Sequence, residues 1–197
     1  TLYTSADVNF MQGMIIHHNQ AIVMSNLVDG RTNSQAIIDL AGRIKVSQDD
    51  EINFMENWLK ERDEMTHSRH HAHHSMKGMA TKEQLEKLAA SLGNSFDQLF
   101  LELMVAHHDG AIEMVSELSK FRGAAYDPVM NEFVSDLVND QAVEIERMNI
   151  LLTEISADPR AGLAGGLYHA DEAILNLELV ASLKKPVGFG KRKKKKH

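Results

Sequence analysis

FMQGMIIHHNQAIVM, residues 10–24, is the stretch that decides the fold. Residues 100–114 read FLELMVAHHDGAIEM, with Phe, Met, His-His, Ala-Ile and Met at the same places. In both copies apolar residues recur three and four positions apart, which predicts an amphipathic helix. The chain therefore contains a duplicated helix that carries two adjacent histidines.

A second pair of similar helices follows these two. Both carry Gln, Glu and Met on one stripe, as Gln48, Glu51 and Met55 and again as Gln141, Glu144 and Met148. One helical hairpin cannot bury its apolar stripe alone, whereas two can. We therefore expect an all-α fold: an antiparallel four-helix bundle of ferritin-like type, built from two duplicated helical hairpins, with short extra helices.

Start and stop signals place the four long helices at 6–28, 34–64, 95–120 and 128–155. Thr81 caps a further short helix, and Gly93-Asn94 breaks the chain before the third long helix. The bundle domain spans 1–157, with a His/Met-rich insertion at 65–79. Residues 158–197 form a C-terminal extension with a short helix and a basic tail.

The amino-acid composition excludes several classes of function. The net charge is −7 although the last seven residues read KRKKKKH, so the body is acidic and a nucleic-acid-binding role is excluded. Cysteine is absent, which excludes disulfides and thiolate metal sites. No stretch approaches the roughly 20 apolar residues of a transmembrane segment. The start at Thr1 fits a processed, exported protein as well as a shortened chain.

The duplicated helices place polar side chains inside the bundle. His17 and His107 lie on the bundle-facing stripes, with His18 and His108 beside them. Because a buried carboxylate needs a partner, we expect two equivalent contacts between histidine and glutamate. A metal site is the other interpretation, since His, Glu and Met are all ligands. The Glu-x-x-His motif of di-iron bundles is absent from the long helices, and both interpretations stay open.

MTHSRHHAHHSMKGM, residues 65–79, concentrates imidazoles and thioethers in what we expect to be a surface excursion between the hairpins. Its candidate ligands are Met65, His67, His70, His71, His73, His74, Met76 and Met79. This composition favours metal binding over a plain hydrophilic linker. Thioethers favour Cu(I), and the lack of cysteine suits an oxidising compartment. Copper is the expected metal, as Cu(I) ahead of Cu(II), with Ag(I) as a mimic and Zn(II) as a lesser candidate at the histidines.

Histidines and methionines on the duplicated helices extend this set. Met11 and Met14 lie three apart, a spacing that can chelate a soft cation across one turn, although core packing explains a methionine stripe equally. The helix candidates are Met11, Met14, His17, His18, Met24, Met104, His107, His108 and Met114.

The paired His-His, Ala-Ile and Met motifs, together with the two Gln-x-x-Glu-Ile motifs, resemble the ferritin-like family known as DUF305. The resemblance covers about 6–154. It implies an exported, periplasmic bacterial bundle that binds copper and contributes to copper resistance and copper homeostasis.

We therefore expect a non-catalytic periplasmic protein that sequesters or relays Cu(I) through Met and His sites. Its partners would be copper ions and periplasmic copper-efflux or copper-sensing proteins, with the chain a monomer or a homodimer. One alternative is a ferritin-like metal-dependent oxidase that uses Glu51, Glu144 and the four helix histidines. The other is a non-metal interaction module with a buried His–Glu network.

Overall fold

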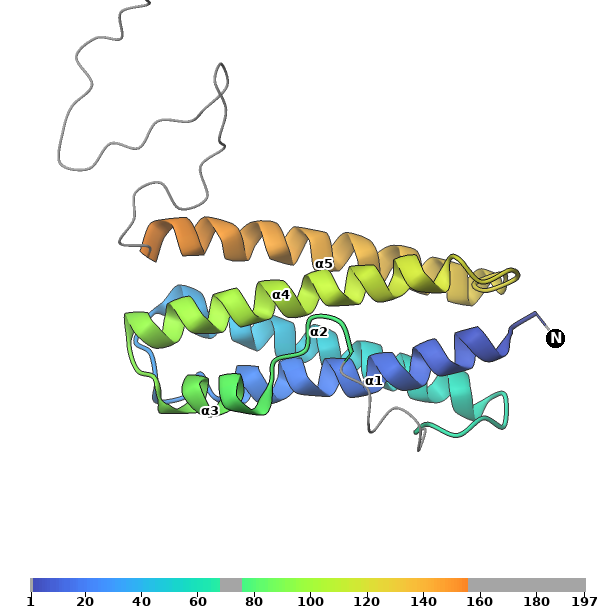
Figure 1. The fold of residues 1–197 in the computed structure, drawn as a ribbon, viewed down its shortest axis with the longest axis horizontal. Helices are drawn as coiled ribbons and strands as arrows, with labels where there is room; N and C mark the ends of the chain where they lie inside the picture. Colours follow the sequence, from blue (N-terminus) through green and yellow to red (C-terminus); the bar gives the residue numbers. More distant parts are fainter. Residues whose placement is uncertain (1, 68–75, 156–197) are drawn as a thin grey trace, which may run out of the picture.

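The structure, a computed structural model, describes residues 2–67 and 76–155. These residues form five helices and no strand, which confirms the expected all-α class (Figure 1). The helices are α1 (Ser5–Asn26), α2 (Gln35–Lys60), α3 (Lys82–Ala90), α4 (Asn94–Leu118) and α5 (Pro128–Ile155). The predicted C-terminal extension 158–197 lies outside the described residues, and so do His70, His71, His73 and His74.

The four long helices pack as two hairpins. α1 packs against α2 and α4 against α5, while α1 and α4 face each other and join the hairpins (Figure 1). The short α3 lies against α4. α1 and α4 carry the two copies of the histidine motif, so the duplicated sequence forms the interface between the hairpins.

The interior consists of two apolar clusters. One contains Phe10, Met14, Met55 and Trp58, and the other contains Met24, Phe100, Met104 and Met148. Between them, along every long helix, lie buried polar residues: His17, His18, Gln48, His107, His108, Gln141 and Glu144. The bundle therefore carries a polar layer across its middle, which the apolar clusters shield from both ends.

The predicted ends of α1 and α2 lie beyond the observed ends, and α2 stops without a glycine. α2 ends at Lys60 instead of residue 64, since Asp63 adopts a φ of 56° and the Glu64 amide donates to the Leu59 carbonyl at 3.0 Å. This is the turn that usually takes glycine. α1 ends at Asn26 instead of residue 28. The cap at Thr81 and the break at Gly93 are confirmed.

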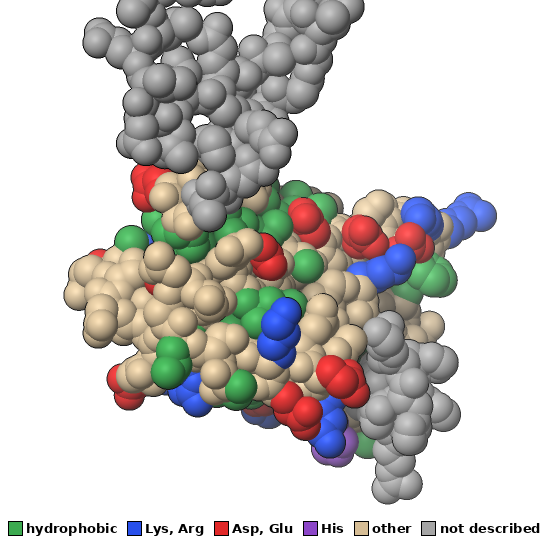
Figure 2. Space-filling view, turned by 60° about the vertical axis from the view of Figure 1, so that its left-hand side comes forward, with side chains coloured by type: hydrophobic (Ala, Val, Ile, Leu, Met, Phe, Trp, Pro, Cys, Tyr) green, Lys and Arg blue, Asp and Glu red, His purple; other side chains and the backbone are tan. Residues whose placement is uncertain are grey.

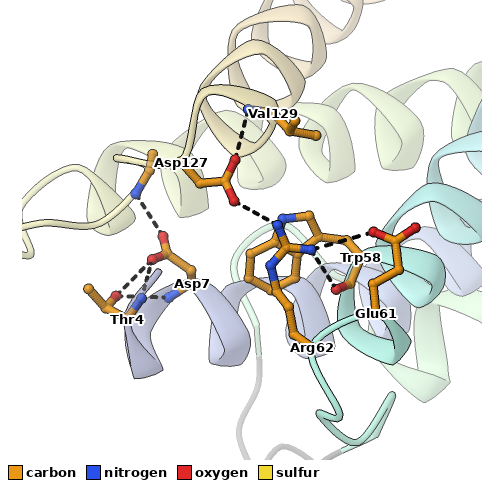
Figure 3. A network of polar contacts seen from close by, with 8 residues as sticks. Thr4, Asp7, Trp58, Glu61, Arg62, Asp127 and Val129 are labelled. Atoms are coloured by element: carbon orange, nitrogen blue, oxygen red, sulfur yellow. Dashed lines mark hydrogen bonds and ion pairs between the residues drawn. The ribbon is translucent and has the colours of Figure 1, made fainter. Parts of the chain in front are cut away.

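One end of the bundle is closed by polar contacts (Figure 3). The Arg62 guanidinium donates to the Asp127 carboxylate at 2.6 Å and lies 4.1 Å from the Trp58 ring centroid. Asp7 accepts from the Ala125 amide at 2.7 Å. These contacts join α1, α2 and the segment before α5. Within the described residues, no helix is long and apolar enough to cross a membrane.

Candidate metal centre

The two histidine pairs meet where α1 and α4 pack. The rings of His17 and His107 are stacked, with centroids 3.8 Å apart and planes inclined by 35°. Both side chains are buried. Because the two residues hold the same position in the two copies of the motif, this stack marks the pseudo-two-fold axis of the bundle.

The second histidine of each pair contacts a glutamate on the neighbouring helix of its own hairpin. His18 Nε2 lies 2.5 Å from Glu51 Oε2, and His108 Nε2 lies 2.6 Å from Glu144 Oε2. Both histidines are fully buried, whereas the carboxylates retain a little exposure. The two expected His–Glu contacts are therefore confirmed, and they tie α1 to α2 and α4 to α5.

The first histidine of each pair donates to a backbone carbonyl. His17 Nε2 donates to the Lys77 carbonyl at 2.9 Å, and His107 Nε2 donates to the His17 carbonyl at 2.8 Å. A carbonyl only accepts, so both rings carry their proton on Nε2. Each then presents the lone pair of Nδ1.

All four Nδ1 atoms are buried and have no hydrogen-bond partner among the described residues. Each Nε2, by contrast, is held by a carboxylate or a carbonyl. Metal-binding histidines almost always have this arrangement, in which an acceptor fixes one nitrogen and leaves the other to the metal. Each interior imidazole therefore has one nitrogen held in place and the other available, which is the state in which a histidine can bind a metal.

Burial also fixes the charge of the stacked pair. It lowers the pKa of His17 to about 4, an effect that the Lys77 carbonyl opposes and His18 reinforces. Burial, followed by the neighbouring His17, lowers the pKa of His107 well below its usual value. Both rings are neutral at pH 7, and neutral imidazole is the form that binds metals.

A short backbone segment, Lys77–Ala80, lies against α1 and α4 just before α3 (Figure 1), and we call it the strap. Its Lys77 carbonyl contacts His17 of the stacked pair. The side chain of Gln20 holds its end, because Gln20 Nε2 donates to the Ala80 carbonyl at 2.9 Å and Gln20 Oε1 accepts from the Ala80 amide at 2.7 Å. Gln12 donates to the Met65 carbonyl at 2.7 Å. The His/Met-rich insertion is therefore anchored on α1 before and after its undescribed part, where the sequence suggested a surface excursion.

The predicted ligands fall into three environments. Met11, Met14, Met24 and Met104 are fully buried in the apolar clusters. Met65 and His67 are exposed, while Met76, Met79 and Met114 are half-buried. On the face shown in Figure 2, histidine is visible only beside the grey atoms. Within residues 2–67 and 76–155, no three His, Cys, Asp or Glu side chains are placed to hold one ion.

Acidic side chains lie on the outer side of the His18–Glu51 pair. A groove of about 850 Å³ between α2 and α5 is lined in part by Asp50, Glu51 and Asp140. Burial raises the pKa of Asp140, and the charges of Glu51, Asp136 and Glu144 raise it further. With Asp39 also in the lining and Arg43 as its basic residue, the groove is negatively charged overall, and negative charge attracts cations.

Sequence reasoning missed the residues that hold the insertion in place. Gln12 and Gln20 lie on α1 and read as ordinary polar surface positions, and the Lys77 carbonyl leaves no trace in the side-chain pattern. One signal was present: the duplicated motif has Gln20 in the first copy and Gly110 in the second. Both positions contact the strap.

Comparison with known proteins places this geometry in a family. The model of a domain of unknown function, DUF305, matches residues 7–152. The chain is a member of the DUF305 family. A DUF305 protein from Streptomyces coelicolor, described as a candidate secreted protein, has a structure similar to that of this DUF305 protein, with a TM-score of 0.68 and 29% identity. That similarity covers 76% of this chain and 93% of the other.

A second solved relative of this DUF305 protein is CopM in its Cu(I)-bound form. The TM-score is 0.60 at 25% identity, over 75% of this chain and 96% of CopM. CopM is also known in a silver-bound form. The uncharacterized protein L153 of Acanthamoeba polyphaga mimivirus is 45% identical over 56 residues, which are 28% of this chain and 37% of the viral protein.

Proposed function

We propose that this DUF305 protein is a non-catalytic, exported copper-binding protein that sequesters or relays Cu(I) through histidine and methionine. The observation that carries the proposal is the set of four buried imidazoles whose Nε2 atoms are held while their Nδ1 atoms lack a partner among the described residues. The binding of Cu(I) and silver by CopM, a relative of the same fold, supports the choice of metal.

The position of the insertion supports the same function. The backbone of Met65, Lys77 and Ala80 contacts Gln12, His17 and Gln20 on α1. The exposed Met65 and the half-buried Met76 and Met79 belong to the segments that these contacts hold on the histidine motif. Soft thioethers and neutral imidazoles together favour Cu(I) over harder ions. The acidic groove beside Glu51 would raise the local concentration of cations.

A second candidate function needs no metal. The His18–Glu51 and His108–Glu144 contacts alone would fix the register of the four helices, as buried polar networks do. An oxidase is the weaker alternative, because a di-iron centre draws several carboxylates to one point and the described residues contain no such group.

Anaerobic Cu(I) titration of the full chain against a chromogenic chelator tests the proposal. The wild type should hold Cu(I) at micromolar free metal, and a His17→Gln, His107→Gln variant should hold less. Met→Leu changes at Met65, Met76 and Met79 should also lower the amount of Cu(I) that the chain holds. Met130→Leu is the control and should leave that amount unchanged, because Met130 lies in the core and is not a predicted ligand. A wild type that retains no Cu(I) would overturn the proposal and favour the metal-free network. Oxygen consumption with Fe(II) would favour the oxidase.

A further inference from the structure

The strap can approach α4 closely only because Gly78 of the strap meets Gly110 of the helix. A Cβ atom on Gly110 would lie 2.7 Å from Gly78 Cα and would overlap the Lys77 carbonyl. A Cβ atom on Gly78 would lie 2.9 Å from Gly110 Cα and would overlap the Ala106 carbonyl. The obstructing atoms are backbone, so the strap would have to move away. Gly78 also has a φ of 73°, which disfavours any other residue.

The duplicated motif makes the strap site asymmetric. Gln20 and Gly110 occupy the same position in the two copies. Gln20 binds the Ala80 backbone through both atoms of its amide, whereas Gly110 provides the space that Gly78 fills. The two copies of the motif therefore contact the strap in different ways, Gln20 by hydrogen bonds and Gly110 by leaving space for it.

The position of the strap determines the tautomer of His17. The Lys77 carbonyl accepts the Nε2 proton of His17, which leaves Nδ1 unprotonated. Without the strap, His17 Nε2 would lose this acceptor, and either nitrogen could carry the proton. Acceptors that hold metal-binding histidines are typically worth about 10- to 100-fold in metal affinity.

We propose that Gly110 and Gln20 are positioning residues for copper binding: they seat the strap, whose Lys77 carbonyl fixes His17 with Nδ1 as the free donor. The seating stands on the contacts above, whereas its consequence for copper rests on the proposed function. The two parts are tested by different measurements on the same full-length chain.

Gly110→Ala tests the seating, and Gly42→Ala is its control. Both glycines lie in helices, but a Cβ atom on Gly42 meets nothing within 4 Å. In metal-free protein, ¹⁵N NMR of the imidazoles should show His17 in the Nε2–H form in the wild type and in Gly42→Ala. In Gly110→Ala the tautomers should be mixed, and exchange of the Ala80 amide should accelerate by at least about tenfold. Because alanine favours helix over glycine, thermal unfolding should show that Gly110→Ala still folds.

Gln20→Ala provides a second variant that adds no volume, and it should accelerate Ala80 exchange in the same way. If His17 keeps its tautomer and Ala80 its protection in Gly110→Ala, the seating is overturned.

The metal part is measured by Cu(I) competition with the same variants. Gly110→Ala should lose about 10- to 100-fold in the affinity of the site that contains His17, and Gly42→Ala should lose none. Unchanged Cu(I) affinity in a Gly110→Ala chain with mixed tautomers would overturn the positioning role. A wild type that binds no Cu(I) would overturn this role together with the proposed function, while the NMR result would still decide the seating.

Discussion

At the scale of single residues, each interior histidine uses one ring nitrogen for structure. His18 and His108 contact carboxylates, whereas His17 and His107 donate to carbonyls. The same hydrogen bonds that stabilise the polar layer leave every Nδ1 atom without a partner among the described residues. The same four side chains therefore combine a stabilising network with ring nitrogens that have no partner among the described residues.

Glu51→Leu should lower the free energy of unfolding by about 2 kcal/mol, because it leaves the buried His18 Nε2 without an acceptor. Glu144→Leu should cost a similar amount, since His108 depends on it in the same way. Urea unfolding at pH 7 measures both. Glu56→Leu is the control on the same helix, where a more exposed pair with Lys60 is worth less than about 1 kcal/mol. An equal loss of unfolding free energy in Glu51→Leu and Glu56→Leu would contradict this prediction.

His17 should make the fold less stable in acid. Its pKa is about 4 in the folded chain and about 6.5 when unfolded, so between these values only the unfolded chain binds the proton. Stability should be constant above pH 6.5, fall as the pH falls towards 4, and lose about 3 kcal/mol in all from this residue. Urea unfolding from pH 7 to pH 4 should show a shallower dependence of stability on pH for His17→Gln than for the wild type. An identical slope for His17→Gln and the wild type would be the contrary result.

At the scale of the elements, helix ends determine how the loops reach the polar layer. Thr81 begins α3 with reciprocal side-chain contacts to Gln84, and it directly follows Ala80, the last residue of the strap. The Thr81 cap that fixes the first residue of α3 therefore also fixes the position of Ala80, the end of the strap.

Thr81→Ala should cost about 1 kcal/mol of stability and should accelerate amide exchange in α3, because it removes the cap. Thr153→Ala is the matched control, since its hydroxyl donates only to the Asn149 carbonyl on an exposed helix surface. That change should stay within about 0.5 kcal/mol. The prediction fails if α3 exchanges at the wild-type rate in Thr81→Ala.

At the scale of the whole molecule, the two hairpins are joined by the α1–α4 interface and by the contacts at the bundle end in Figure 3. Arg62 at the end of α2 and Asp127 before α5 belong to different hairpins. Their ion pair therefore contributes to the docking of one hairpin on the other.

Arg62→Gln should lower the free energy of unfolding by about 2 kcal/mol, because it removes the charge-assisted bond to Asp127 and the contact with the Trp58 ring. Arg147→Gln, on an exposed face of α5, should change stability by less than about 0.5 kcal/mol. Thermal and urea unfolding of the two variants measure the difference. A loss no larger for Arg62 than for Arg147 would show that the bundle end contributes little.

The parts of the structure that were predictable follow from side-chain type and helical spacing. The 3-4 spacing of Gln48, Glu51 and Met55 predicts one buried stripe, and a glutamate on such a stripe needs a partner such as His18. The end of α2 was not predictable in this way, because Asp63 adopts a conformation for which glycine is the usual signal. The strap was missed because its principal contact is the Lys77 carbonyl, and every residue carries a carbonyl.

The sequence by itself determined the helices, their pairing by duplication and the gathering of histidine, glutamate and glutamine in one layer, since apolar periodicity and burial act along each helix separately. Only the tertiary structure decided which nitrogen of each histidine is held and which is free. That choice depends on acceptors such as the Lys77 carbonyl and Glu51, which reach His17 and His18 from chain segments more than 30 residues away.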